Sequence, residues 1–240
     1  MVPFLGPADP LPPVGSALRE PNGLLAAGGG LSVPRLLDAY RRGVFPWFDP
    51  GDPVLWWSPD PRLVLPTDAV HVSRSLGRRL RRGDFRVTLD AAFVTVMHGC
   101  AAPRDDDDRT WISAEMVRAY QALHEHGAAH SVEVWMEDEL AGGLYGVAIG
   151  RAFFGESMFS RRPDASKIAL VTLARQLARW AMPLVDCQVR TDHLVSLGAV
   201  ELPRHEFLRR IAELVDRPAV PGPWRLDADL AGGAPHGAGC

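Results

Sequence analysis

The stretch LAGGLYGVAIGRAFFGESM, residues 140–158, decides the fold. Two apolar runs, 140–149 and 152–158, flank Gly150-Arg151, and this pattern predicts a β-hairpin joined by a tight turn. Helical patterns precede and follow the hairpin along the chain. A sheet built around such a hairpin and covered by helices predicts a mixed α/β sandwich for residues 62–217.

Helices with defined starts are expected on both sides of the hairpin. Ser73, Asp90 and Ser113 stand where helices would begin, and their side-chain oxygens can accept hydrogen bonds from first-turn amides. After the hairpin, the sequence predicts a helix over 164–180, a strand over 184–189 and a last helix over 205–215.

Composition divides the chain into three parts. Residues 1–61 contain many prolines, a short helical pattern and aromatic loops, which predicts a small N-terminal domain. Residues 62–217 predict the larger α/β domain. Residues 218–240 are rich in Pro, Gly and Ala, and we expect a flexible tail there.

The overall composition is that of a globular protein, with 240 residues and 47% hydrophobic content. No apolar run approaches the roughly 20 residues of a membrane helix, so no membrane partner is expected. The N-terminus lacks a basic start followed by an apolar core, which predicts a cytoplasmic location. Three cysteines without CxxC spacing, and histidines without a completed ligand set, predict no metal site. No additional hydrophobic helix stripe calls for a partner, so a monomer is expected.

A basic helix stands out against the formal net charge of -3. Four arginines at spacing i, i+4, i+7 and i+8 share one helical face. They are Arg74, Arg78, Arg81 and Arg82. Guanidinium forks match phosphate oxygens, so the face predicts a phosphate-binding surface, although a solvated charged face explains it equally well. The run Asp105–Asp108 predicts an exposed acidic loop.

Four tryptophans lie in loop contexts bounded by Gly, Pro and Ser. Trp56 and Trp57 are interpreted as core residues. Trp47 and Trp111 can either stack on an unpaired base or close a core, and the sequence leaves both interpretations open.

Two polar groups sit within apolar strands. Glu156 is surrounded by apolar residues, and a buried carboxylate needs partners, either as a structural anchor or as part of a site. Asp186 and Gln188 should point to one face of a strand and Cys187 to the other. A carboxylate beside an amide can receive an amine, whereas Cys187 is interpreted as a buried thiol.

Several strings in one order resemble the leucyl/phenylalanyl-tRNA–protein transferase family. The resemblance runs from about Arg19 to Phe207. The strings are Pro21-Asn22-Gly23-Leu24-Leu25-Ala26, Phe45-Pro46-Trp47-Phe48, Trp56-Trp57-Ser58-Pro59, Thr110-Trp111-Ile112, His130-Ser131-Val132-Glu133, Gly155-Glu156-Ser157-Met158-Phe159-Ser160 and Asp186-Cys187-Gln188.

The resemblance implies an aminoacyltransferase. It implies transfer of Leu, Phe or Met from aminoacyl-tRNA to proteins with an N-terminal Arg or Lys, which marks them for degradation by an N-degron route. It also implies a GCN5-related acetyltransferase-like fold for the larger, catalytic domain.

The family's site residues map onto this chain as follows. The basic helix holds the tRNA, and Trp47 and Trp111 surround the terminal adenosine. Tyr120, Leu144 and Phe153 form or adjoin the amino-acid pocket. Asp186 and Gln188 are the catalytic pair, with Glu156 beside them.

No cofactor is expected, because an aminoacyl ester is already activated. The phosphate loop typical of coenzyme A-dependent acyltransferases, the alternative enzyme class, is not found in the sequence. A non-catalytic tRNA-binding protein is a second alternative. The residues leave open whether the Asp186–Gln188 pair or the ribose of the tRNA moves the proton.

Overall fold

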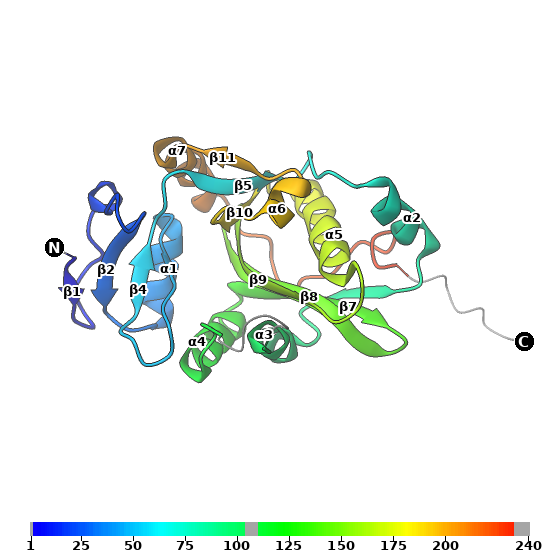
Figure 1. Ribbon diagram of the computed structural model, residues 1–240, viewed down its shortest axis with the longest axis horizontal. Coiled ribbons are helices and arrows are strands. Elements are labelled where there is room, and N and C mark those ends of the chain that lie inside the picture. The colour runs from blue at the N-terminus through cyan, green and yellow to red at the C-terminus, as the bar shows by residue number, and fades with distance from the viewer. Residues whose placement is uncertain (1, 104–109, 233–240) are drawn as a thin grey trace, which may run out of the picture.

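The computed structural model describes residues 2–103 and 110–232, so the predicted acidic loop at Asp105–Asp108 lies outside the described residues. Within the described chain, the strands form two separate sheets. Figure 1 shows the small sheet at one end of an elongated molecule and the large sheet filling the rest.

The small sheet belongs to the N-terminal part of the chain and has the order β1-β2-β4-β3. Its strands are β1 (Phe4–Leu5), β2 (Leu24–Gly28), β3 (Phe45–Pro46) and β4 (Leu55–Trp57), with the 3-10 turn η1 (Val14–Ser16) and helix α1 (Val33–Arg41) between them. Trp56 is fully buried and its indole donates to the Gly28 carbonyl at 2.9 Å, which confirms its core assignment. Trp57 is only half-buried.

The large sheet has seven strands in the order β11-β5-β10-β9-β8-β7-β6. They are β5 (Arg62–Pro66), β6 (Arg86–Leu89), β7 (Ala129–Met136), β8 (Glu139–Ile149), β9 (Ala152–Ser160), β10 (Leu184–Gln188) and β11 (Val200–Leu202). The β8–β9 hairpin turns at Gly150 and Arg151, as predicted. Within this sheet β9 and β10 pair in parallel, whereas the other neighbours are antiparallel.

Helices cover both faces of the large sheet. In Figure 1, α3 (Phe93–Ala101) and α4 (Ala114–Glu125) lie below it, and α5 (Ala165–Arg179) lies above. Helices α2 (Arg74–Arg82), α6 (Asp192–Ser196) and α7 (Arg204–Val215) complete the large part. The predicted mixed α/β class is confirmed. No helix in the described part of the chain is both long and apolar enough to cross a bilayer.

The helix caps predicted at Ser73 and Ser113 are confirmed. The hydroxyl oxygens of Ser73 and Ser113 accept from the third amide of their helices, Leu76 and Met116, at 3.2 Å. The prediction for Asp90 is wrong. Its carboxylate accepts from the Ser131 amide at 2.9 Å instead.

The turn that leads into α3 is instead held by a neighbouring strand. The buried Glu133 of β7 accepts from the amides of Ala91 and Ala92 at 3.4 and 3.3 Å. Burial raises the pKa of this carboxyl. A contact from a distant strand cannot be recognised from the local sequence around the start of a helix.

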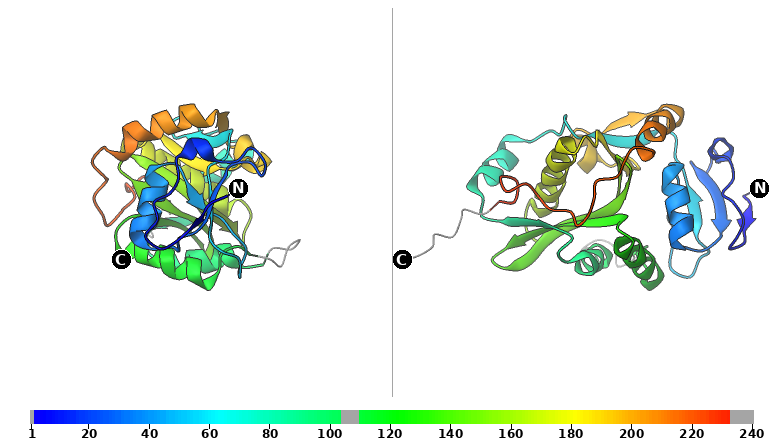
Figure 2. Two further views of the ribbon diagram at one scale, coloured as in Figure 1. Left: turned by 90° about the vertical axis from the view of Figure 1, so that its left-hand side faces the viewer. Right: turned by 180° about the vertical axis from the view of Figure 1, so that it is seen from behind.

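The chain after α7 packs on the large sheet instead of leaving it. Trp224 is buried, with its ring stacked 3.6 Å from that of His130. Arg179 pairs with Asp227 and Asp229 at 2.6 Å each. Figure 2 shows this segment crossing the back of the large part. Thus residues 218–232 differ from the expected flexible tail, while 233–240 lie outside the described residues.

Candidate active site

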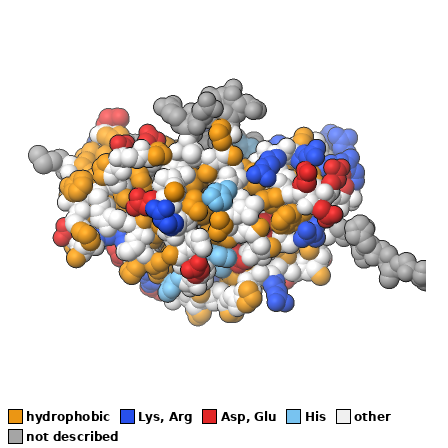
Figure 3. All heavy atoms as spheres, turned by 90° about the horizontal axis from the view of Figure 1, so that it is seen from below, with side chains coloured by type: hydrophobic (Ala, Val, Ile, Leu, Met, Phe, Trp, Pro, Cys, Tyr) orange, Lys and Arg blue, Asp and Glu red, His pale blue; other side chains and the backbone are white. Residues whose placement is uncertain are grey.

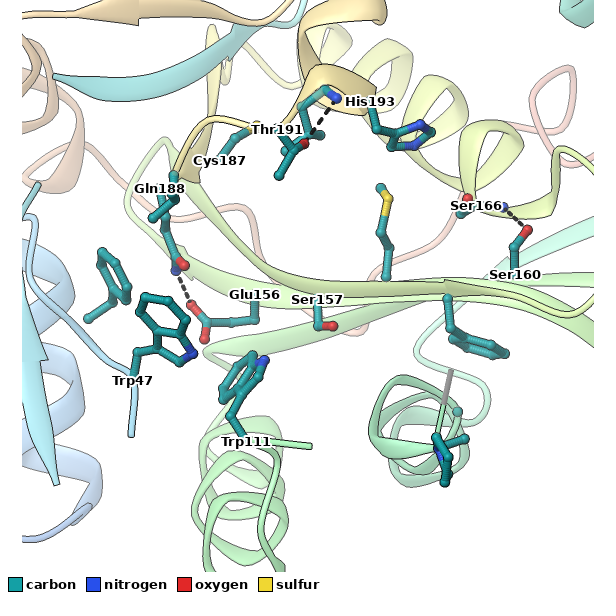
Figure 4. Close-up of a pocket in the computed structure, with 18 of the residues that line it drawn as sticks. Trp47, Trp111, Glu156, Ser157, Ser160, Ser166, Cys187, Gln188, Thr191 and His193 are labelled. Atoms are coloured by element: carbon teal, nitrogen blue, oxygen red, sulfur yellow. Dashed lines mark hydrogen bonds between the residues drawn. The ribbon is translucent and has the colours of Figure 1, made fainter. Parts of the chain in front are cut away.

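A cleft of ≈ 860 Å³ opens between the small sheet, strand β9 and the segment from β10 to α6. Figure 4 shows Trp47 and Trp111 beside Glu156, a hydrogen bond that joins Glu156 to Gln188, and Cys187 farther along the same segment as Gln188. The parallel β9–β10 pair places the ends of these two strands side by side at the cleft.

Glu156 is held by three elements that are distant in sequence. The Tyr120 hydroxyl of α4 donates to its Oε2 at 3.0 Å, and the Gln188 side-chain amide donates to its Oε1 at 2.7 Å. The Tyr40 hydroxyl of α1 contacts that of Tyr120. Burial is the largest influence and raises the pKa of Glu156 to about 7, although the Tyr and Gln hydrogen bonds lower it. Both protonation states are therefore accessible near neutral pH.

Gln188 occupies an unusual backbone conformation at the end of β10. Its φ is 63°, in the left-handed region, which is rare for residues other than glycine. The register of β10 against β5 shifts between Asp186 and Gln188. Because the amide nitrogen of the side chain is bound to Glu156, the amide oxygen is left as the acceptor toward the cleft.

The predicted orientation of the Asp186–Gln188 pair is wrong. The register shift breaks strand alternation, so Cys187 and Gln188 both line the cleft while Asp186 does not. Asp186 is fully buried and accepts two hydrogen bonds from Arg62, at 2.8 and 2.6 Å. It still contacts Gln188, but through the backbone amide, at 3.0 Å. The thiol of Cys187 has a raised pKa, chiefly because it is buried.

A small apolar pocket of ≈ 100 Å³ adjoins the cleft. It shares Glu156, Ser157, Met158, Cys187 and Leu194 with the cleft. Leu144 and Phe153 line it, together with Leu170, Leu173 and Val185. Tyr120, expected at this pocket, is fully buried and binds Glu156 instead.

The two undecided tryptophans both line the cleft. Trp47 is 45% exposed, and its backbone carbonyl accepts from the Trp57 indole at 2.7 Å. Trp111 lies just before α4, and Figure 4 shows it near Trp47 below Glu156. Trp47 therefore does not close a core, and Trp111 is half-buried at the cleft.

The four arginines of the basic face are exposed on α2. Helix α2 lies at the end of the molecule opposite the small sheet (Figure 1), where Figure 3 shows Lys and Arg side chains gathered among acidic ones. Arg82 pairs with Asp84 at 2.6 Å. Arg74, Arg78 and Arg81 make no ion pair with the described residues, so three charges are available to an anion.

The structure also reveals site residues that the sequence reasoning missed. Arg62 and Tyr40 reach the site through buried contacts, and His193 of α6 lines the cleft. Burial, followed by the charge of Lys167, lowers the pKa of His193. Of these residues, only Arg62 could have been noticed in the sequence, because it is a charged residue at the start of an apolar strand. Among the described residues, no group of three or more His, Cys, Asp or Glu side chains is placed to hold a metal ion.

Fold and site together define a mixed α/β enzyme with a carboxyl–amide couple at the mouth of an apolar pocket. Comparison with known proteins then identifies the chain as a member of the leucyl/phenylalanyl-tRNA–protein transferase family. The family model "Leucyl/phenylalanyl-tRNA protein transferase" matches residues 64–212, and that of the family's N-terminal domain matches residues 29–60.

Similar proteins cover nearly the whole chain. The leucyl/phenylalanyl-tRNA–protein transferase of Thiobacillus denitrificans is 59% identical and covers 92% of this chain and 97% of its own. That of Nitrosomonas europaea is 59% identical, with 93% and 94% covered. A GCN5-related N-acetyltransferase from Kribbella flavida matches with a TM-score of 0.33 at 13% identity, covering 68% of this chain and 57% of that one. A likeness that distant carries no inference about the site.

Proposed function

We propose that this protein transfers Leu, Phe or Met from aminoacyl-tRNA to the N-terminal Arg or Lys of an acceptor protein. The observation that carries the proposal is the apolar pocket that opens beside Glu156 and Gln188. An aminoacyl ester needs an apolar pocket for its side chain and polar groups at its carbonyl. Here Leu144 and Phe153 line the apolar pocket, and Glu156 and Gln188 supply the polar groups.

The chemistry is an exchange of an ester for an amide. The neutral α-amine of the acceptor attacks the ester carbonyl, the C–N bond forms, and the bond to the ribose oxygen breaks. The oxygen of the Gln188 amide accepts a hydrogen bond from the attacking amine and aims its lone pair at the carbonyl. The amine's proton ends on the ribose oxygen, which leaves as a hydroxyl. Holding both reactants in place can lower the barrier by about 7–11 kcal/mol.

The RNA part of the donor is held at two places. Trp47 and Trp111 enclose the terminal adenosine in the cleft, where base stacking contributes about 1–3 kcal/mol per base. Arg74, Arg78 and Arg81 bind backbone phosphates on α2, and Arg82, which is paired with Asp84, borders them. Three phosphate contacts at ~0.7–0.9 each give a slope of about -2 to -3 for log affinity against log salt concentration.

The setting follows from these substrates. The donor is already activated, so the reaction uses no cofactor. We place the protein in the cytoplasm as a monomer, and we expect its products to enter an N-degron route. Residues 1–61 and 62–217 are proposed as a small domain and a catalytic domain, with 218–240 as a C-terminal extension.

A peptide-extension assay tests the proposal. Purified protein is mixed with labelled Phe-tRNA and a peptide beginning with Arg, and the product is detected by mass. Wild-type protein should add one Phe, and Gln188→Ala should reduce kcat by at least tenfold.

The matched control is Gln121→Ala, which removes an amide from α4 outside the cleft. It should leave kcat unchanged. Binding of Phe-tRNA without any extended peptide would leave the protein as a tRNA-binding protein and refute the proposed transfer.

A further inference from the structure

Arg62 is a fully buried arginine that faces the back of the site. Its guanidinium donates to both carboxylate oxygens of Asp186, and neither side chain is exposed to solvent. Burying two charges is costly, and an apolar pair of similar volume is often as stable. A buried ion pair at the active site therefore calls for an explanation other than stability.

The guanidinium also lies between two aromatic rings. Its Cζ is 4.7 Å from the centroid of Phe45 and 4.7 Å from that of Phe207. Phe45 belongs to β3 of the small sheet and lines the cleft, whereas Phe207 belongs to α7. The Nη1 atom of Arg62 has no hydrogen-bond partner in the described structure. The side chain is thus arranged for planar stacking and a two-pronged contact.

Asp186 links Arg62 to Gln188 through hydrogen bonds. The same Oδ1 that accepts from Arg62 also accepts from the Gln188 backbone amide at 3.0 Å. That contact spans the register shift and holds the left-handed backbone of Gln188. A non-glycine residue persists in this conformation only when its surroundings impose it. The direction of the Gln188 side chain therefore depends on Asp186.

We propose that Arg62 is a positioning residue for aminoacyl transfer, holding Gln188 through Asp186 and the cleft wall of the small sheet through Phe45. One guanidinium thereby sets the separation of the two walls between which the ester and the amine must meet. Asp186 acts through the backbone of Gln188 and does not touch the substrate. This inference rests on the proposed function of Gln188.

The test separates positioning from folding with paired substitutions. Arg62→Met and Asp186→Leu each leave an unpaired buried charge and should lower the Tm strongly. The double variant R62M/D186L removes both charges and should recover most of the Tm. Its kcat should nevertheless fall by about 100-fold, because a displacement of about 1 Å at the reacting groups costs that much. The KM for Phe-tRNA should stay within twofold.

Two further variants complete the design. Arg62→Lys keeps the charge but cannot make the two-pronged, stacked contact, so its kcat should fall at least tenfold, and less than that of Arg62→Met. Arg35→Met is the matched control. Arg35 is a buried arginine of the small part that donates to the Gly6 and Pro7 carbonyls and does not reach the cleft. This control should lose stability and keep kcat.

The outcomes are distinct. A folded double variant with a kcat within twofold of wild type overturns the positioning role, as does a loss seen only in KM. If the double variant does not fold, a wild-type kcat in Arg62→Lys overturns it instead. Failure of the wild-type protein to extend any peptide would refute the proposed function and this inference with it, whereas wild-type kcat in the variants would overturn the positioning role alone.

Discussion

Replacing Glu156 by Gln should stabilise the protein at pH 8 and much less at pH 5. Burial raises the pKa of the Glu156 carboxyl from 4.5 to about 7. Between these values the folded protein holds a proton that the unfolded chain has lost. The wild-type protein therefore loses stability as the pH rises through this window.

The size of the effect follows from the pKa shift. Raising the pKa of Glu156 from 4.5 to about 7 corresponds to about 3 kcal/mol of folding free energy, at ~1.36 kcal/mol per pKa unit. Because pH 5 and pH 8 span most of the window, the free energy of unfolding of Glu156→Gln relative to wild type should increase by about 2–3 kcal/mol between them. The substituted amide keeps the local hydrogen bonds, since its oxygen can accept from Gln188 and its nitrogen can donate to the Tyr120 hydroxyl.

Urea unfolding of both proteins at several pH values measures this difference directly. Glu115→Gln, on an exposed position of α4, controls for the loss of one charge. The reasoning is refuted if the stability difference between Glu156→Gln and wild type is the same at pH 5 and pH 8. That result would mean that the carboxyl is ionised throughout and that water compensates for its burial.

Three other substitutions test separate parts of the molecule. Arg78→Glu should weaken tRNA binding and flatten the salt slope by about 1, as measured by filter binding across salt concentrations; an unchanged slope argues against a phosphate contact. Leu144→Phe should reduce the ≈ 100 Å³ pocket and lower kcat/KM for Phe-tRNA at least tenfold in competition assays, whereas an unchanged value would place the amino-acid side chain elsewhere. Trp224→Ala removes a 3% exposed ring and should cost about 3–5 kcal/mol in urea unfolding; a loss below 1 kcal/mol would show that the segment after α7 is held by other contacts.

The site could be predicted in part from the sequence. Glu156, Gln188, Trp47, Trp111, Leu144 and Phe153 all line the cleft or its pocket. Residue patterns single out Glu156, Gln188 and the two tryptophans as candidates, and the family resemblance adds Leu144 and Phe153 and the expected roles. Local periodicity does not show which strand ends meet. Tyr120 and Asp186 contact site residues from behind, and the sequence could not distinguish that arrangement from contact with a substrate.

The local sequence determined the helix caps, the hairpin turn and the exposed face of α2. Ser73 and Ser113 cap their helices with their own side chains, and Gly150-Arg151 turns the hairpin. The amphipathic spacing of α2 exposes its arginines as expected. Hydrogen bonds over three residues and periodic burial depend on neighbours in the chain, so the sequence specifies them directly.

Tertiary structure decided the features that depend on distant partners. The register shift of β10 against β5 places Gln188 with Cys187 at the cleft, while Asp186 binds Arg62, 124 residues away. The buried Trp224 stacks on His130 of β7, a contact that no local pattern around Trp224 shows. Strand alternation predicts side-chain direction only while pairing is regular. A carboxylate that forms charge-assisted hydrogen bonds with a buried guanidinium takes its position from that distant partner.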